Sequence, residues 1–298
     1  MSVRDTIRSM VPTALLEWNR TRKKKQQRKS LEQKRAAGAV WTKEKLVTSL
    51  KEAGVDAQRD LLVHSAMSKI GYVEGGPATV VAALQDSLHP SSTLLMPTSP
   101  VVTLQAKHEL ALFDVASTPS KMGAITEYFR ANVASHRSAH PLEPVAAYGP
   151  RAEAYTSLHH TDSTSYGTNS PWRKHMEHDG QILYIGTTLI NSGTSLHAVE
   201  DAIGHENFKF PIYLGHRKTF NVLLQGRTLS ITSTVHNPVW SNKRECDGLI
   251  PLLETKGALK RVTVGEAPSL LVDAAKMKSI LLEEYALRGV TMYTPQGS

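Results

Sequence analysis

The feature that most constrains the fold is an alternation of short apolar runs with a helical pattern between residues 60 and 98. The run Asp60-Leu61-Leu62-Val63-His64 is short and apolar at its centre, as in a strand buried on both faces. A loop over 65–76 leads to 77–84, which carries proline in its first helical turn. A second apolar run occupies 93–98. This strand–loop–helix–strand order predicts a βαβ unit, and therefore an α/β fold.

Further elements are expected on both sides of this unit. Thr42, followed by Glu44, is a typical N-cap for a helix over 42–53. The continuous apolar run 181–186 predicts another buried strand, and 195–202 a helix after it. Alternation within 219–236 predicts antiparallel strands. A C-terminal helix is expected over about 268–288.

The charge of the chain is concentrated at its N-terminus. Residues 1–40 contain eleven Lys or Arg and three Asp or Glu, which accounts for the whole net charge of +8. The other 258 residues carry 24 side chains of each sign and are neutral. We therefore expect two parts: a basic amphipathic extension over 1–40 and one globular domain over 41–298.

The extension allows several functions. It joins apolar residues before Pro12 and around Trp18 to a polybasic run over 20–29. This combination suits attachment to an anionic membrane surface. It equally suits a helix that packs on the body or on a second subunit, so a homo-oligomer stays open. Nucleic acid is not predicted as a partner, because no DNA-binding motif accompanies the charge.

The composition excludes several classes of protein. The sequence contains no run of about 18 apolar residues, so no transmembrane helix is predicted. No secretory signal is recognisable. Cys246 is the single cysteine, which excludes an intramolecular disulfide and is typical of a cytoplasmic protein. It lies in a polar run, 242–247, and we interpret it as an incidental loop residue.

The loop after the first strand is a candidate anion site. In open α/β sheets, ligands bind at the carboxyl ends of strands. The small residues of 65–71 let backbone N–H groups approach a phosphate, and Lys69 adds positive charge. The segment is neither a Walker A sequence nor G-x-G-x-x-G, so by itself it is equally compatible with a surface turn.

The segment 190–201 is a candidate catalytic centre. It follows a predicted buried strand and enters a predicted helix, where His197 and Glu200 at i and i+3 share one face. A carboxylate beside an imidazole fixes its tautomer and raises its basicity, as a general base requires. Thr194 and Asn191 could donate hydrogen bonds to an oxyanion, and Asp201 is a second acid within reach. A structural histidine is the alternative.

His140 is a third candidate, because the His140-Pro141 corner could hold an imidazole over a cleft. The histidine clusters 159–160 and 175–178 have no zinc spacing closed by other ligands, so no metal is predicted. The absence of G-x-S-x-G argues against a serine nucleophile.

Taken together, these segments resemble the aminoglycoside 3-N-acetyltransferase family. The resemblance runs over about 42–298 and is weakest in the last third. It is carried in order by 60–65, 70–81, 94–98, 137–141, 145–150, 170–172 and, most diagnostically, Asn191-Ser192-Gly193-Thr194-Ser195-Leu196-His197 with Glu200.

The resemblance implies a central mixed sheet flanked by helices and acetyl-CoA or another acyl-CoA as the donor. It implies catalytic roles for His197, Glu200, Thr194 and Asn191 in direct transfer without an acyl-enzyme. Ser65, Ser68, Lys69, Ile70 and Gly71 would bind the coenzyme, and His140 and Thr98 the acceptor.

The expected reaction is therefore N-acylation of an amino sugar. The family includes relatives that act on nucleotide-linked sugars in surface polysaccharide synthesis. The neutral body favours this acceptor, since a polycationic drug is better captured by an acidic protein. Within 99–136 only three residues are acidic, which also disfavours a polycationic acceptor: Glu109, Asp114 and Glu127. Aminoglycoside modification is the alternative, and a non-catalytic membrane-associated binding protein on the same fold is the alternative of another class.

Overall fold

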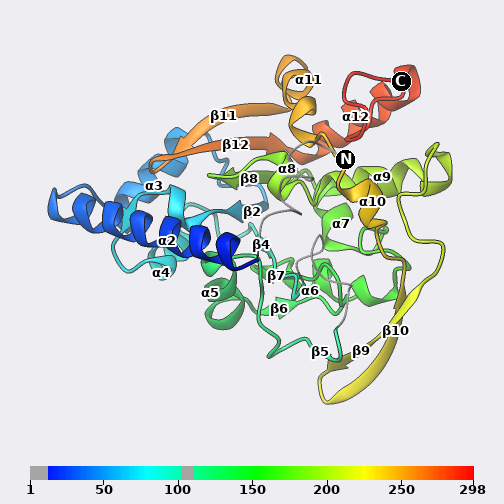
Figure 1. Cartoon of the computed structure of the whole chain (residues 1–298), viewed down its shortest axis with the longest axis horizontal. Helices are drawn as coiled ribbons and strands as arrows, with labels where there is room; N and C mark the ends of the chain where they lie inside the picture. The colour runs from blue at the N-terminus through cyan, green and yellow to red at the C-terminus, as the bar shows by residue number, and fades with distance from the viewer. Residues whose placement is uncertain (1–12, 102–109) are drawn as a thin grey trace.

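The computed structural model describes residues 13–101 and 110–298. Its main feature is a mixed seven-stranded sheet with the strand order β11-β12-β8-β2-β4-β7-β6 (Figure 1). The central strands β8, β2 and β4 are parallel, and the outer pairs are antiparallel. The strands of this sheet are β2 (Leu61–Ser65), β4 (Leu94–Pro97), β6 (His136–Arg137), β7 (Val145–Tyr148), β8 (Gln181–Ile185), β11 (Leu259–Val264) and β12 (Ala267–Asp273).

Two smaller sheets accompany the main one. The short strands β1 (Val40–Trp41) and β3 (Tyr72–Val73) pair in parallel. A three-stranded sheet has the order β10-β9-β5 and consists of β5 (Phe113–Asp114), β9 (Lys218–Leu224) and β10 (Arg227–Ser233). The antiparallel pairing of β9 with β10 confirms the strands predicted within 219–236.

Each face of the main sheet carries its own hydrophobic core, because side chains alternate along each strand. Leu61 and Val63 of β2 face a core closed by α3 (Lys43–Glu52), α4 (Pro77–Asp86) and α5 (Ala124–Asn132). Leu62 faces the other core. That core is closed by α6 (Ala152–Thr156), α7 (Pro171–Glu177), α9 (Leu196–Ile203), α11 (Ile250–Thr255) and α12 (Ala274–Arg288). Figure 1 shows the sheet between these two groups of helices.

The remaining elements are short helical segments that connect these layers. They are α8 (Leu189–Ser192), α10 (Pro238–Ser241) and the 3₁₀ turns η1 (Met67–Lys69), η2 (His159–Thr161), η3 (His205–Asn207) and η4 (Cys246–Leu249). No helix in the described ranges is both long and apolar enough to cross a bilayer.

Local sequence rules account for most of these boundaries. The Thr42 hydroxyl accepts a hydrogen bond from the Lys45 N–H and caps α3, as predicted. Pro77 opens α4, and β2 pairs with β4 in parallel, which confirms the βαβ unit. The helix predicted over 268–288 was wrong for residues 268–273, which form a strand. Leu270, Leu271 and Val272 form β12 between β11 and β8, and the helix begins only after Asp273, which caps it.

The expectation for Cys246 is corrected by its burial. Cys246 lies in η4 with 1% of its surface exposed, its thiol 3.6 Å from Met292 Sδ, so it belongs to the core and not to a loop. Burial raises the pKa of this thiol to about 12, which makes it a poor nucleophile.

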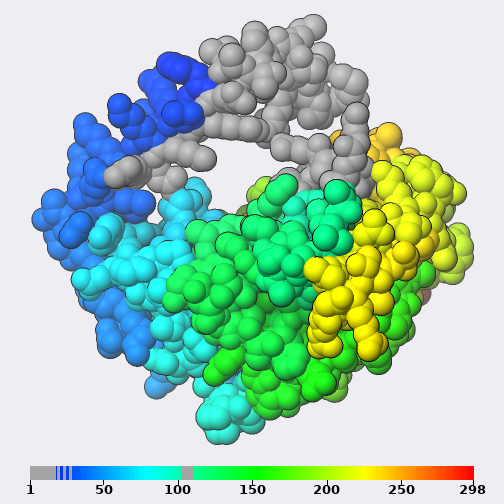
Figure 2. Space-filling model, turned by 90° about the horizontal axis from the view of Figure 1, so that it is seen from below, coloured from blue at the N-terminus to red at the C-terminus, as the bar shows by residue number. Residues whose placement is uncertain are grey.

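Residues 13–36 form a single long helix, α2 (Thr13–Ala36). Near its C-terminal end α2 is held to the body: Lys34 pairs with Glu266, and the Arg35 guanidinium lies 5.7 Å from the centre of the Tyr72 ring. Figure 2 shows the darkest blue part of α2 standing away from the cyan and green body. Residues 1–12, which include part of the predicted apolar segment, lie outside the described residues. The predicted boundary after residue 40 falls within β1, four residues beyond the end of α2, and the division into two domains stays a prediction.

Candidate active site

The candidate centre lies where the central strand β8 ends and α9 begins. All five residues of β8 are buried in the sheet, and the chain continues through α8 into α9. His197 and Glu200, one helical turn apart on α9, are 4% and 2% exposed. His197 Nδ1 is hydrogen-bonded to Glu200 Oε2. The pairing predicted from the i, i+3 spacing is therefore present.

Aromatic rings from three other segments enclose the His197 imidazole. Tyr166 stacks on it with ring centres 5.0 Å apart, and His236 lies 4.1 Å away on a tilted plane. Tyr213 in turn stacks on His236 at 4.7 Å. These rings come from before α7, from after β10 and from the segment before β9, so the environment of His197 is built by tertiary packing.

The burial of the pair determines its protonation. Burial, with a smaller contribution from the Arg244 guanidinium, lowers the pKa of His197 well below its ordinary value of 6.5. Burial likewise raises the pKa of Glu200 to about 7. The neutral imidazole is therefore the stable form near pH 7, which is the form that can accept a proton.

Arg244 completes the hydrogen bonding of the ring. Its Nη1 lies 2.9 Å from His197 Nε2, and its Nε donates to the Ser241 carbonyl at 2.8 Å. Sequence analysis missed this residue, because it lies 47 positions from His197 in a polar run without any motif. Tyr166, Tyr213 and His236 were missed for the same reason.

The two predicted oxyanion donors lie just before His197 in the chain, but no contact among the described residues defines their roles. Thr194 is half-buried and directly precedes the helix that carries His197. Asn191 lies on α8, and its amide donates to Thr188 Oγ1 at 3.1 Å. Their catalytic roles stay predictions.

The loop predicted to bind the coenzyme follows β2, next to the strand that leads to His197. It forms the turn η1, which exposes Ser68 and Lys69, while Ser65 is half-buried. The Ile70 side chain is fully buried in the α3–α5 core, so any contact of this residue with the coenzyme would be made by its backbone, and its role stays a prediction.

Gly71 has a structural reason to be glycine. Its φ is +104°, and a Cβ there would lie 2.8 Å from Glu266 Oε1 and 2.9 Å from Trp41 Cδ1. A larger residue would therefore disturb the contact between the loop and β1, whatever the loop binds.

Neither predicted acceptor contact lies on a surface. His140 is fully buried: its Nε2 lies 3.1 Å from Ser233 Oγ, and its ring stacks on His159. Thr98 is fully buried too, since its hydroxyl donates to the Pro144 carbonyl and accepts from Arg137 Nε. Both side chains thus make internal hydrogen bonds, and their contact with the acceptor stays a prediction.

A cavity of about 1200 Å³ lies on the C-terminal side of this centre. Tyr293 lines it, and the Tyr293 hydroxyl lies near enough to Glu200 to lower the pKa of that carboxyl, an effect that burial outweighs. Aromatic side chains form part of its wall, and Lys209, Lys243 and Glu245 are its charged groups. The aromatic lining residues are Phe208, Phe210, Trp240, Tyr285 and Tyr293.

The donor atoms of His197, Glu200 and His236 lie within 4.8 Å of one another, a spacing that a metal ion could use. Two contacts oppose that use. His197 Nδ1 is already bonded to Glu200, and a guanidinium lies 2.9 Å from His197 Nε2, where it would repel a cation. We assign no metal ligands here, and the expected lack of a metal stays a prediction.

Comparison with known proteins relates the sequence of this chain to one family of enzymes. The sequence profile of the family described as aminoglycoside 3-N-acetyltransferase matches residues 62–284, a span that includes the loop after β2 and the His197–Glu200 pair. Aminoglycoside N(3)-acetyltransferase III of Salmonella sp is 31% identical over 186 residues, which are 58% of this chain and 64% of that relative. The match thus spans somewhat less than two thirds of that enzyme.

Solved structures agree with the fold. The enzyme AAC-IIIb in a binary complex with CoASH is 23% identical, with a TM-score of 0.67, and the alignment covers 83% of this chain and 97% of that one. A variant of AAC(3)-IVa in complex with gentamicin is 26% identical, with a TM-score of 0.67, over 83% and 89%. Because the family profile covers most of the sheet and the whole candidate centre, the chain belongs to the aminoglycoside 3-N-acetyltransferase family.

Proposed function

We propose that this protein is an acyl-CoA-dependent N-acyltransferase that acylates an amine of an aminoglycoside-type amino sugar. The observation that carries the proposal is the buried His197–Glu200 pair at the start of α9, within the span that the family profile matches. The relative from Salmonella sp carries this activity in its name, and the neighbouring structures hold CoASH or gentamicin.

The pair has the features that such a reaction needs. An amine that adds to a thioester carbonyl must lose a proton, and the neutral imidazole of His197 can take it at Nε2. Glu200 holds the opposite nitrogen and stabilises the imidazolium that forms. As the C–N bond forms and the C–S bond breaks, the proton passes to the departing thiolate, so that an amide and free CoA result.

The coenzyme site is proposed at the loop after β2. Lys69 and Ser68 are exposed there, beside the C-terminal end of β8. A lysine and backbone N–H groups suit the phosphates of CoA. Thr194 and Asn191 are proposed as donors to the oxyanion of the tetrahedral intermediate.

The acceptor is less constrained than the reaction. The names of the relatives favour an aminoglycoside over the nucleotide-linked sugar expected from the charge of the body. One observation keeps the nucleotide-linked sugar as a second candidate: the cavity beside Glu200 is lined by Lys209 and Lys243 but only one acid, Glu245. Such a wall suits an anionic acceptor better than a polycation.

The deciding experiment is a transfer assay that follows free thiol. The purified protein is given acetyl-CoA with gentamicin, sisomicin or apramycin, or with a nucleoside-diphosphate amino sugar. Turnover of the first group supports the main proposal, and turnover of the last group alone supports the second. No turnover with any amine and acyl-CoA, while CoA still binds, would favour the non-catalytic binding protein.

Helix α2 adds a proposal about location. We infer that it holds the enzyme at an anionic membrane surface, in keeping with its run of Lys and Arg over 20–35 and with the exposure of Trp18, which is 57%. This proposal is independent of the reaction, because the predicted centre lies wholly in the body.

A further inference from the structure

Arg244 is placed at the nitrogen that the proposed mechanism uses. It lies between α10 and η4, half-buried, with its Nε fixed on the Ser241 carbonyl. Its Nη1 lies 2.9 Å from His197 Nε2. A guanidinium has donors only, so at this distance it donates, and His197 Nε2 must carry a lone pair. The imidazole proton is then on Nδ1, where Glu200 accepts it.

The two contacts therefore select one form of the ring. A neutral imidazole can carry its proton on either nitrogen, and a single neighbour does not exclude protonation of the other. Glu200 from α9 and Arg244 from the segment between α10 and η4 together favour the tautomer in which Nδ1 carries the proton and Nε2 is unprotonated. The other groups that face the ring are Tyr166 and His236, which stack or tilt against it. Arg244 alone among these four puts a permanent positive charge next to Nε2.

We propose that Arg244 is a positioning residue for His197: it holds the tautomer whose Nε2 carries the lone pair, and it yields this nitrogen to the acceptor amine. This inference rests on the proposed acyltransferase function for its second half. When His197 takes the proton from the attacking amine, Nε2 becomes a donor, and two donors repel. Arg244 can return only after the proton has left for the CoA thiolate, which readies the site for the next turnover.

The tautomer is tested first, by nitrogen NMR of histidine-labelled full-length protein without substrate. The His197 signals are assigned by their loss in His197→Asn. The expected result in the unsubstituted protein is a neutral ring with its proton on Nδ1. A proton on Nε2 would overturn the proposal, because Arg244 could not then donate to that nitrogen. This measurement needs no variant of Arg244 and no activity.

Substitutions then test the charge. Arg244→Gln keeps a donor but removes the charge, and Arg244→Lys keeps the charge. Arg227→Gln, at an exposed arginine that opens β10, is the matched control. Removing a positive charge at this distance should raise the His197 pKa by about one unit or more in Arg244→Gln. The acid limb of kcat/KM should move to higher pH by the same amount. Arg244→Lys should bring the His197 pKa and the acid limb most of the way back to their values in the unsubstituted protein. The control should leave the pKa and the acid limb unchanged.

The outcomes separate this inference from the proposed function. If Arg244→Gln loses activity but leaves the His197 titration and the pH profile unshifted, Arg244 has only a structural role and the proposal fails. If no acceptor is turned over but the tautomer and titration change as expected, the positioning role stands and the proposed reaction fails. If Arg244→Gln does not fold, the tautomer of the unsubstituted protein and the Lys variant still decide.

Discussion

At the scale of single residues, the proposed chemistry depends on one imidazole. His197 accepts the proton of the amine, so His197→Asn should lower kcat by about 10²–10⁴-fold, the usual contribution of general acid–base catalysis. His205→Asn is the matched control, since its side chain is 61% exposed in η3, just after the same helix. A thiol-release assay at saturating acetyl-CoA measures both. Loss of activity in the control, or near-normal turnover of His197→Asn, would remove His197 from the mechanism.

Sequence alone identified the helical half of this centre and missed the rest. His197 and Glu200 share a helix, so their spacing predicts their contact. Arg244, Tyr166 and His236 contact the His197 ring from separate segments of the chain, and no local sequence pattern predicts such long-range contacts. For His140 and Thr98 the sequence did not show that both side chains are buried and make internal hydrogen bonds, because their partners lie far away in the chain.

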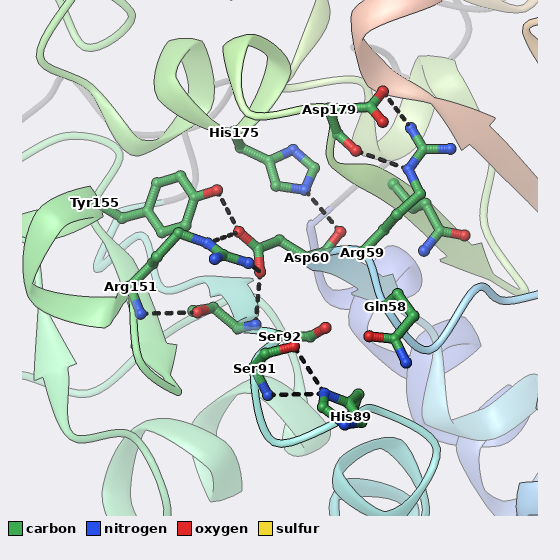
Figure 3. A network of polar contacts seen from close by, with 12 residues as sticks. Gln58, Arg59, Asp60, His89, Ser91, Ser92, Arg151, Tyr155, His175 and Asp179 are labelled. Carbon is green, nitrogen blue, oxygen red and sulfur yellow. Dashed lines mark hydrogen bonds and ion pairs between the residues drawn. The ribbon is translucent and has the colours of Figure 1, made fainter.

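Buried charge is also used for stability, at the opposite end of β2 from the candidate site. Asp60 is 1% exposed and accepts hydrogen bonds from Arg151 Nε at 2.7 Å, from the Tyr155 hydroxyl and from the Thr93 N–H (Figure 3). Burial alone would raise the pKa of Asp60, but the bonds from Arg151, Tyr155 and Thr93 outweigh it and lower the pKa below its ordinary value.

This network should appear in the pH dependence of unfolding. A carboxylate with a lowered folded-state pKa stabilises the fold above its unfolded pKa, near 4, and this contribution is lost as pH falls through the folded-state pKa. Asp60→Asn should therefore cost about 3 kcal/mol at pH 7, and less as the pH falls below about 4. Urea unfolding between pH 3 and 7 measures this.

The control for Asp60 is Asp179→Asn. Asp179 also pairs with an arginine, Arg59, but its side chain is 71% exposed, so the loss should stay under about 1 kcal/mol (Figure 3). An equal cost for the two variants, or a cost for Asp60→Asn that does not change with pH, would contradict the assignment of the network.

At the scale of elements, the loop between β2 and β3 is expected to bind the coenzyme. The structure changes how this should be tested, because any substitution of Gly71 would strain the backbone and collide with Trp41. Lys69→Ala removes an exposed charge instead, and it should raise the KM for acetyl-CoA several-fold with little change in the KM for the amine. Lys51→Ala, on the exposed side of α3, is the control. A selective effect of Lys69→Ala on the amine would place the acceptor at this loop.

The same comparison shows which elements were predictable. The strands β2, β4 and β8 and the helices α3, α4 and α9 were expected because each has a run or cap of its own. β12 was taken for helix because its apolar residues fit either period over a short stretch. Its pairing partners, β11 and β8, lie before it in the chain, the latter more than 80 residues away, so the strand is fixed by the sheet and not by its own sequence.

At the scale of the whole molecule, the charge is divided between a basic helix and a neutral body. The body contains both cores, the seven-stranded sheet and all the residues of the candidate centre. α2 contacts it near its last turn, through Lys34 with Glu266 and Arg35 with Tyr72. A protein lacking residues 1–36 should therefore fold and keep its activity, if the helix serves location and not catalysis.

The membrane role of α2 can be tested by sedimentation with vesicles. Each Lys or Arg near an anionic surface contributes about 1 kcal/mol of attraction, and the run over 20–35 contains nine of them. The full-length protein should sediment with phosphatidylserine-rich vesicles at low salt and be released as salt rises, because exposed charges are screened over about 10 Å at 0.1 M. The protein without residues 1–36 should stay in the supernatant, as should both proteins with neutral vesicles. Equal, negligible binding by both forms would end the membrane proposal. Unfolding or altered assembly of the shortened protein would show instead that α2 packs on the body or on a second subunit.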